Sequence, residues 1–431
     1  MPQPTYDAIV IGTGPGGATV AREMSRRNKR VLMLERGPGG PIRGNLRQYI
    51  VEQCVPGKSL LITEQGLAMV RAMTVGGSSL FYYATAFPVP FDMLERQGID
   101  IRDEVAEARR ELPIAPLKEE MITPAAGRIM EAARDLGYPW NPLDKIMYQD
   151  RWKPEFPFGY YGDPHGVKWS SRMFVREAQR NGADLAARAR VTRVIVEKGA
   201  AVGVEYLQKG ALKKAFAERV IVSAGGIGSP AILRKSGIRG VGRDFFFDPL
   251  VTVCGECAEG QIKQGNEIPM STGCHMEEEG YVMTDMAVPD ILDNLFAAGV
   301  LRPKGCFRSS RTLRIMVKAR DDLGGRVTAG EGIRKKLSAT DRRKLLRGAE
   351  RAKSILERAG ARNIYRTGYL AAHPGGTVKI GEHLDARLST RIDRLHVCDC
   401  SVIPEPWGLP PTLTLIGLGK HLARVLCGEK K

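Results

Sequence analysis

The chain has 431 residues, which corresponds to two or three domains at about 150 residues per domain. Hydrophobic residues make up 43% and charged residues 26%, values typical of folded globular proteins, so a disordered chain is excluded. The net charge is +17, and no apolar run approaches the roughly 18 residues of a membrane span. Residues 1–7 have neither the basic nor the apolar region of a secretory signal, which predicts a cytoplasmic protein.

The N-terminal segment predicts a strand, a glycine turn, a helix and a second strand. Residues 8–11 are a short apolar run typical of a buried parallel strand, and the sequence Gly-Thr-Gly-Pro-Gly-Gly follows at 12–17. A helix is expected from Ala18 to about Arg27, and an apolar strand at 31–34 ends on Glu35.

This order of elements is typical of a dinucleotide-binding unit. Gly12 permits the tight turn, Gly14 lets the backbone approach a pyrophosphate, and Gly17 lets the helix pack closely on the strand. The N-terminus of the helix presents free N–H groups to phosphates, and Glu35 stands where an acid can bind ribose hydroxyls. The expected cofactor-binding residues here are Gly12, Gly14, Pro15, Gly17, Glu35 and Arg36.

The middle of the chain predicts less regular structure. Between residues 88 and 163 the composition shifts to Pro, Asp, Glu and Arg, which indicates an inserted region rather than core. Strands are expected at 191–196, 202–206, 219–223 and 312–318. A helix is expected from about 340 to 359, capped by Thr340 and ended by Gly360, with one apolar and one basic face.

Residues 301–370 concentrate the positive charge, with 20 Lys or Arg against 6 Asp or Glu. Such a surface can attract an anionic membrane face, an acidic partner or an anionic substrate, and the alternative is a solvated helix face. Nucleic acid is not expected, because no nucleic-acid-binding motif accompanies the charge.

Eight cysteines occur, and a disulfide framework is not expected in a long intracellular chain. Cys254, Cys257, Cys274 and His275 offer three thiolates and an imidazole to zinc. Their spacing is loose, and Cys254 ends what reads as a strand, so no metal site is expected. Cys398 and Cys400 are expected to pack as small residues beside a bulky ring system.

Three further segments are rich in glycine or proline: residues 75–87, residues 223–238, and the pair 373–404 and 410–415. Together with the N-terminal fingerprint, they resemble the motifs of the glucose-methanol-choline (GMC) oxidoreductase family, in the order that the family has them. The four motifs span the chain, which is compact for that family, so its substrate region is expected to be trimmed.

The resemblance implies an α/β fold in which a discontinuous Rossmann-like FAD-binding domain holds an inserted α+β substrate domain. The FAD-binding domain would comprise 1–90, 167–247 and 373–431, and the substrate or cap domain 91–166 and 248–372. By motif match, Gly77 and Ser78 would lie over the flavin side of FAD and the Val191 backbone would hold the adenine. Asp399 would reach the ribityl chain, and Pro411 and Thr412 would approach the pyrimidine end of the flavin.

The last of these assignments has an independent physical reason. Pro410 and Pro411 precede an expected helix that runs to about Leu426, and proline suits the first helical turn. The N-terminus of that helix would stabilise negative charge on a reduced flavin. The alternative is a plain capped C-terminal helix.

His373 is the expected catalytic base. Oxidation of an alcohol requires removal of the hydroxyl proton as hydride leaves the carbon, and imidazole titrates near neutral pH. In the family, the histidine of this His-Pro-x-Gly-Thr motif is one of a catalytic pair that faces the flavin. The alternative is a buried histidine satisfied by backbone groups.

The sequence departs from the family pattern at two positions. Leu409 or Pro410 stands where the family has a second catalytic Asn or His, and neither can hydrogen-bond a substrate oxygen. Tyr82 stands where the family usually has Asn beside the flavin. Its hydroxyl is expected either to exchange a proton with the substrate or to belong to a ring packed on the isoalloxazine.

We therefore expect an FAD-dependent dehydrogenase that acts on a small-molecule alcohol and passes electrons to a quinone or a redox protein. The basic segment 301–370 would suit peripheral contact with the inner membrane face. One alternative is flavin chemistry on another bond, as in a desaturase, reductase or lyase. The other is a flavin electron-transfer protein without substrate chemistry.

Overall fold

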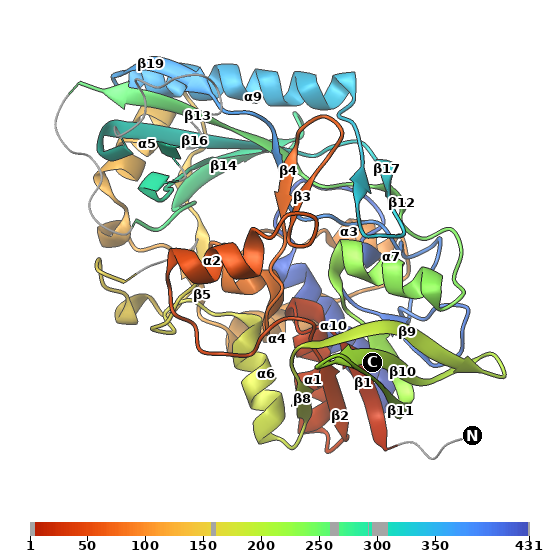
Figure 1. Cartoon of the computed structure of the whole chain (residues 1–431). Helices are drawn as coiled ribbons and strands as arrows, with labels where there is room; N and C mark the ends of the chain where they lie inside the picture. The colour runs from red at the N-terminus through yellow and green to blue at the C-terminus, as the bar shows by residue number, and fades with distance from the viewer. Residues whose placement is uncertain (1–4, 157–160, 259–266, 292, 295–308, 430–431) are drawn as a thin grey trace.

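Two β-sheets dominate the structure, which is a computed structural model describing residues 5–156, 161–258, 267–291, 293–294 and 309–429. Among these residues the sheets contain seven and nine strands. They lie at opposite ends of the molecule, the first in the lower half of Figure 1 and the second in the upper half. No helix in the described part of the chain has the length and apolar character needed to cross a membrane.

The first sheet is built from the short apolar runs seen in the sequence. Strands β8, β2, β1 and β11 lie side by side in parallel, and β21 pairs with the end of β11. The first half of β11 pairs instead with β10 in antiparallel fashion, and β10 pairs with β9. The strands are β1 (Tyr6–Ile11), β2 (Val31–Leu34), β8 (Asp184–Ala186), β9 (Ala189–Glu197), β10 (Ala200–Gln208), β11 (Ala211–Val222) and β21 (Leu395–Val397).

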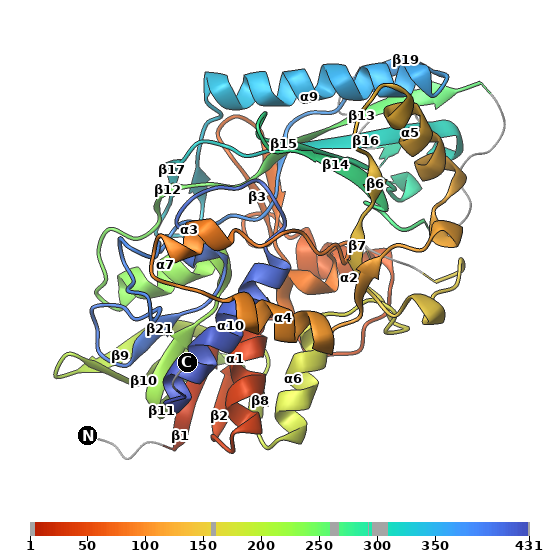
Figure 2. The same ribbon diagram turned by 180° about the vertical axis from the view of Figure 1, so that it is seen from behind.

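Four helices form a layer on one side of this sheet, seen in front in Figure 2. They are α1 (Pro15–Arg26), α4 (Arg102–Glu111), α6 (Ser171–Arg180) and α10 (Thr412–Cys427). Small residues let them approach closely, because a Cβ at Gly419 would lie 3.0 Å from the Gly16 carbonyl oxygen. A Cβ at Gly417 would lie 2.8 Å from Val105 Cγ2. On the other side, α7 (Gly225–Lys235) packs against β9.

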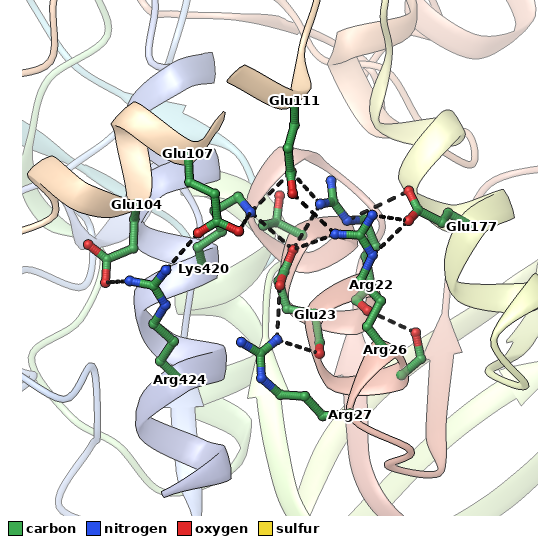
Figure 3. Close-up of polar contacts among 12 residues, drawn as sticks. Arg22, Glu23, Arg26, Arg27, Glu104, Glu107, Glu111, Glu177, Lys420 and Arg424 are labelled. Atoms are coloured by element: carbon green, nitrogen blue, oxygen red, sulfur yellow. Dashed lines mark hydrogen bonds and ion pairs between the residues drawn. The ribbon is translucent and has the colours of Figure 1, made fainter. Parts of the chain in front are cut away.

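A network of ion pairs joins the four helices (Figure 3). Lys420 of α10 is 1% exposed, and its Nζ lies 3.3, 2.8 and 3.1 Å from carboxylate oxygens of Glu23, Glu107 and Glu111. Arg22 of α1 is equally buried and contacts Glu23 at 3.0 Å and also Glu111. Because buried charges need partners, this network fixes the first helix of the chain against the last.

The second sheet is mostly antiparallel and carries a different pattern on each face. Helix α9 (Ala339–Arg358) covers one face, where Ile315 and Val317 of β16 are fully buried under it. The other face carries Met316 and Lys318 of the same strand. Its strands are β3 (Leu60–Ile62), β4 (Ala68–Val70), β6 (Asn141–Pro142), β13 (Pro249–Cys257), β14 (Thr272–Met276), β15 (Tyr281–Asp285), β16 (Thr312–Ala319), β19 (Ala361–Arg366) and β20 (Leu370–Ala371).

The remaining elements are mostly short, and the longest of them is a helix that packs against α9. Strands β12, β17 and β18 form a small sheet, and β5 pairs with β7. Their bounds, and those of the remaining helices, are β5 (Ile114–Pro116), β7 (Asp144–Ile146), β12 (Arg243–Phe245), β17 (Gly324–Val327), β18 (Ile333–Arg334), α2 (Leu46–Gln53), α3 (Phe91–Glu95) and α5 (Pro124–Asp135).

Two local predictions are wrong. Helix α9 is capped by Ser338, not Thr340, because Ser338 and Asp341 form a reciprocal capping box. Residues 88–163 are not merely an insertion outside the core, since Ile101, Val105 and Ala108 on one side of α4 belong to the core of the first sheet. The α/β fold and the other predicted strands and helices agree with the structure to within a few residues, except that β11 begins eight residues earlier. The domain boundaries expected from the sequence stay a proposal.

Candidate functional site

The glycine turn after β1 leads directly into the N-terminus of α1. Gly12 has φ +98°, and a Cβ there would lie 2.2 Å from the Ser223 carbonyl oxygen, so only glycine fits. Gly14 is the N-cap residue of α1 and Pro15 is in its first turn. Apart from its own chain neighbours, no atom of the described residues lies within 4 Å of a Cβ at Gly14, which leaves the backbone accessible from that side. A Cβ at Gly17 would lie 2.4 Å from the Gly12 carbonyl oxygen.

Glu35 ties three segments together at the end of β2. Its carboxylate accepts hydrogen bonds from the Thr13 amide at 3.1 Å, the Thr13 hydroxyl at 2.7 Å and the Gly37 amide at 2.8 Å. The Gly76 amide in turn donates to Thr13 Oγ1 at 3.0 Å. Burial raises the pKa of Glu35, and these donors oppose the shift. The motif at 75–78 is thereby held against the glycine turn.

Gly77 and Ser78 lie beside that turn. A Cβ at Gly77 would come within 3.1 Å of Gly14 Cα, and Gly77 has φ +56°. The Ser78 hydroxyl accepts a hydrogen bond from the Ala72 amide at 3.1 Å. The structure therefore brings Gly12, Gly14, Gly17, Glu35 and Gly77 to one place.

Val191 and Arg36 lie near Glu35. Ala189 starts β9 and its amide donates to the Glu35 carbonyl at 2.8 Å, so Val191 stands two residues beyond that contact. The Arg36 side chain points to Glu331, with an N–O distance of 2.9 Å. Arg36 is thus engaged by a carboxylate from a distant segment.

Asp399 lies at the N-terminus of α7. Its Oδ2 accepts from the Gly225 amide at 2.8 Å and from the Ser229 hydroxyl at 2.5 Å, and its Oδ1 accepts from the Ser401 amide at 2.8 Å. The preceding carbonyl, that of Cys398, would lie 2.2 Å from a Cβ at Gly16. Asp399 therefore connects the start of α1 with the start of α7.

The His373 loop packs on the same end of α7. A Cβ at Gly226 would lie 1.9 Å from the Pro374 carbonyl oxygen, so this contact also requires glycine. The His373 side chain is 31% exposed. Its Nδ1 lies 3.0 Å from Asp248 Oδ2 and 3.5 Å from Lys318 Nζ. Burial and the Lys318 ammonium lower the pKa of His373, and Asp248 opposes them.

The segment before α10 carries the expected proline pair. Pro411 is the N-cap residue and Thr412 the first residue of the helix, as the sequence predicts for the helix itself. Leu409 is 3% exposed and packs in an apolar cluster with Phe87, Val282 and Met316, with Tyr83 and Trp407 against it. Leu409, one of the two residues expected at the family's second catalytic position, is therefore part of an apolar cluster in this structure.

Tyr82 has an unusual environment. Its hydroxyl is buried and has no hydrogen-bond partner among the described residues, and burial raises its pKa well above the ordinary value. Lys168 Nζ donates to the Tyr82 carbonyl at 2.7 Å and lies 5.4 Å from the centre of its ring. No described contact joins Tyr82 to His373, so the structure does not bring these two directly together.

Lys145 and Lys168 are functional-site candidates that the sequence analysis missed. Both ammonium groups are buried and donate to carbonyl oxygens of residues 80–83, the loop that follows Gly77 and Ser78. Burial lowers the pKa of each lysine to about 7. The apolar neighbours of these lysines, Ile146 and Met147 for Lys145 and Val167 and Trp169 for Lys168, could have signalled that they are buried.

Cys254 and Cys257 lie on β13, whereas Cys274 and His275 lie on β14. Strands β16 and β15 separate these two strands, which puts them about 14 Å apart. The four side chains therefore cannot share a zinc ion, and no group of metal-ligating side chains is found among the described residues.

The described residues fit FAD. The open backbone at Gly14 and the N-terminus of α1 suit a pyrophosphate, and Glu35 suits a ribose. The Tyr82 hydroxyl, which is buried and has no hydrogen-bond partner among the described residues, and the N-terminus of α10 are the polar groups expected to face the ring end of the cofactor.

Comparisons with known proteins agree with this fit. A family model described as GMC oxidoreductase matches residues 6–250. An uncharacterized protein of Methanocaldococcus jannaschii is 24% identical over 97% of this chain and 99% of its own length. A long-chain-alcohol oxidase of Arabidopsis thaliana is 22% identical over 95% of this chain and 66% of its own length.

Solved structures share the fold. Pyridoxine 4-oxidase from Mesorbium loti superposes with a TM-score of 0.78 at 16% identity, covering 99% of this chain and 100% of that one. A formate oxidase of Aspergillus oryzae has a TM-score of 0.73 at 14% identity, covering 98% of both chains. At these identities the likeness concerns the fold alone. The family match spans more than half of the chain, so the protein belongs to the GMC oxidoreductase family and is an FAD-dependent oxidoreductase.

Proposed function

We propose that this enzyme oxidises the CH–OH group of a small or lipid-like alcohol, with His373 as the general base. The observation that carries the proposal is a partly exposed imidazole whose Nδ1 is engaged from behind by Asp248. Nε2 is the ring nitrogen that remains for a substrate hydroxyl. A base must be unprotonated, and the lowered pKa of His373 meets this requirement at neutral pH.

Oxidation of a CH–OH group removes a proton from oxygen and a hydride from carbon. FAD, when bound, supplies the acceptor for the hydride. His373 would take the proton at Nε2. The N-terminus of α10 would stabilise negative charge on the reduced flavin.

The apolar cluster around Leu409 supports an alcohol with a hydrocarbon part. It lies on the face of the second sheet that also carries Lys318, and it contains three methionines. Methionine side chains adapt their shape to varied apolar ligands. The members are Phe87, Met270, Val282, Met286, Val288, Met316 and Leu409, with Tyr83, Leu143, Leu250 and Trp407 packed against them.

Leu409 also favours a second candidate function. Without a second polar residue opposite His373, an alkoxide would lose a hydrogen bond worth about 1.5–3 kcal/mol. Flavin chemistry on another bond, as in a desaturase, reductase or lyase, does not need that hydrogen bond. The Tyr82 hydroxyl, which has no partner among the described residues, is a candidate proton donor or acceptor for either reaction.

A quinone or a redox protein is the proposed electron acceptor. Helix α9 exposes Arg343, Arg347 and Arg358, which would suit an acidic partner or an anionic membrane surface. Arg347 and Arg358 already pair with Glu279 and Asp135. Residues 301–308 of the basic segment lie outside the described residues.

Anaerobic mixing of the FAD-loaded enzyme with a panel of alcohols tests the reaction. We expect loss of the flavin absorbance with at least one alcohol, and a rate reduced by about 10²–10⁴ in His373→Ala. His165→Ala is the matched control, because His165 is exposed and stacks on Phe156 outside the proposed site.

The same experiment separates the alternatives. Bleaching only by a donor without a hydroxyl group would favour desaturation, reduction or lyase chemistry. Bleaching by no small molecule, together with rapid electron exchange with a redox protein, would favour an electron-transfer protein.

A further inference from the structure

His373 stands in front of a buried ion pair. Asp248 Oδ2 lies 3.2 Å from Lys318 Nζ, and both side chains are at most 2% exposed. The same Oδ2 lies 3.0 Å from His373 Nδ1, whereas Lys318 Nζ lies 3.5 Å from that nitrogen. Two nitrogen atoms, Lys318 Nζ and His373 Nδ1, therefore converge on one carboxylate oxygen.

These contacts assign the protons of the imidazole. An ionised carboxylate only accepts hydrogen bonds, and an ammonium only donates them. The shorter of the two contacts at Nδ1 is the one to Asp248, so Nδ1–H donates to Asp248 Oδ2. The neutral ring then has its lone pair on Nε2, the nitrogen that a proton acceptor needs.

The backbone on both sides of this contact is constrained. Asp248 has φ +46° and His373 has φ +30°, conformations that side-chain-bearing residues rarely adopt. The two segments exchange main-chain hydrogen bonds, from Phe246 to Gly375 at 3.1 Å and from Gly375 to Phe246 at 2.9 Å. The Ala372 amide also donates to the Phe247 carbonyl at 2.8 Å. Strained backbone of this kind persists where its surroundings determine it, and here it aims Asp248 at His373.

A second buried ion pair, Asp321 with Lys335, holds the backbone that carries Asp248. The Asp321 carboxylate accepts hydrogen bonds from the amides of Phe247 and Asp248, at 3.2 and 3.0 Å. Lys335 Nζ lies 2.8 Å from Asp321 Oδ2. The thiol of Cys400 lies 3.8 Å from the His373 carbonyl, and burial raises its pKa well above the ordinary value, so it stays neutral.

We propose that Asp248 and Lys318 are positioning residues that hold His373 as the neutral Nδ1–H tautomer with Nε2 toward the substrate. A carboxylate alone would favour the charged imidazolium, which cannot accept a proton. Burial lowers the pKa of Lys318 and Asp248 opposes that shift. In its charged form the Lys318 ammonium cancels the carboxylate charge, while the carboxylate keeps its orienting hydrogen bond to His373. Because Asp248 and Lys318 orient the imidazole at Nδ1, they compensate for the hydrogen bond to the substrate oxygen that Leu409 cannot make. This inference rests on the proposed role of His373.

Titration of His373 by NMR in the FAD-loaded enzyme, with histidine labelled in the ring, tests the proposal without turnover. The chain has six histidines, and the His373 signal is the one lost in His373→Gln. We expect an Nδ1–H tautomer and a pKa below the ordinary value near 6.5.

Charge-removing variants should shift this pKa in opposite directions. Lys318→Met should raise the pKa of His373 by about one unit, a tenfold change in proton affinity, because an uncompensated carboxylate remains. Asp248→Asn should lower it by about one unit, because the ammonium remains. The double variant should return it toward the starting value. The acid limb of the pH profile for flavin reduction should move in the same directions.

Arg314→Met is the matched control. Arg314 lies on the same strand as Lys318 and forms an equally buried pair with Asp293, with N–O distances of 2.7 and 2.5 Å. Its loss should lower stability and leave the pKa of His373 unchanged. A structural role of Lys318 alone would give this same result.

Shifts in one direction in both single variants, or an Nε2–H tautomer in the unmodified enzyme, would overturn the proposal. If the single variants do not fold, the tautomer and pKa of the unmodified enzyme decide the question. If His373→Ala bleaches normally while NMR gives the expected tautomer, the proposed function fails and the positioning pair stands.

Discussion

The two sheets contribute to the site in different ways. The first sheet offers backbone: its glycine turn leads into the N-terminus of α1, and the backbone at Gly14 is open on the side where a Cβ would lie. The second sheet offers side chains, since Lys318 and Met316 project from one face of β16 while α9 covers the other. We therefore expect binding of the cofactor to depend on backbone geometry, and binding and chemistry of the substrate to depend on side chains that can vary within one fold.

The largest effect should come from the glycine turn of the first sheet. Gly12→Ala should cost more than about 4 kcal/mol of unfolding free energy, because φ is +98° and the Cβ would overlap the Ser223 carbonyl. Gly14→Ala should cost at most about 1 kcal/mol, because its Cβ meets no protein atom. It should nevertheless lose FAD, because the Cβ occupies the side open to the pyrophosphate.

Denaturant unfolding of the apoprotein and the flavin absorbance of the purified protein measure these two effects separately. Retention of stoichiometric FAD by Gly14→Ala would show that cofactor binding does not depend on the open backbone of the first sheet.

A pair of valines tests the two faces of the second sheet. Val317 is buried under α9, and Val282 is buried on the face toward the proposed substrate site. Replacement of either by Ala should cost about 2–3 kcal/mol in stability, because each leaves a cavity. Only Val282→Ala should change the KM for a bulky alcohol, by about three- to tenfold.

Steady-state kinetics and thermal unfolding of both variants make this comparison. Equal changes in KM for the two variants would mean that substrate binding does not distinguish the face that carries Val282 from the face under α9.

The smallest effect concerns pH and the first sheet. Burial lowers the pKa of His396 on β21 to about 4. The unfolded chain therefore binds more protons than the folded chain between pH 4 and 6.5, so stability rises with pH across this window and is lost as pH falls. About 2 kcal/mol of that dependence falls between pH 5 and 7, and His396→Gln should remove it.

Denaturant unfolding at several pH values between 4 and 7 measures this slope for both proteins. His165→Ala, which removes an exposed imidazole, should leave the slope unchanged. An unaltered slope in His396→Gln would show that another group accounts for the acid sensitivity.

The sequence predicts the first sheet well because its signals are local. The apolar runs, the glycines and Glu35 occur within about 30 consecutive residues, and the structure has β1, α1 and β2 there in that order. The capping box of α9 is equally local, but Thr340 lies close enough to Ser338 to be mistaken for the cap. The apolar side of α4 was hidden by the charged residues around it.

The environment of His373 could not be predicted in this way. Asp248 precedes His373 by 125 residues, and Lys318 is the next-to-last residue of the buried strand β16. The pairing of β13 with β16, with Leu250 opposite Lys318, brings these side chains together. Because register between distant strands leaves no local pattern, only the folded chain reveals the pair.

The ion-pair network between α1 and α10 has a consequence for synthesis. Residues 395–427 supply β21 and α10, which complete a sheet begun by the first strands of the chain. Residues 395–427 are synthesised long after β1 and α1, so β21 and α10 can join the first strands and the first helix only late in translation.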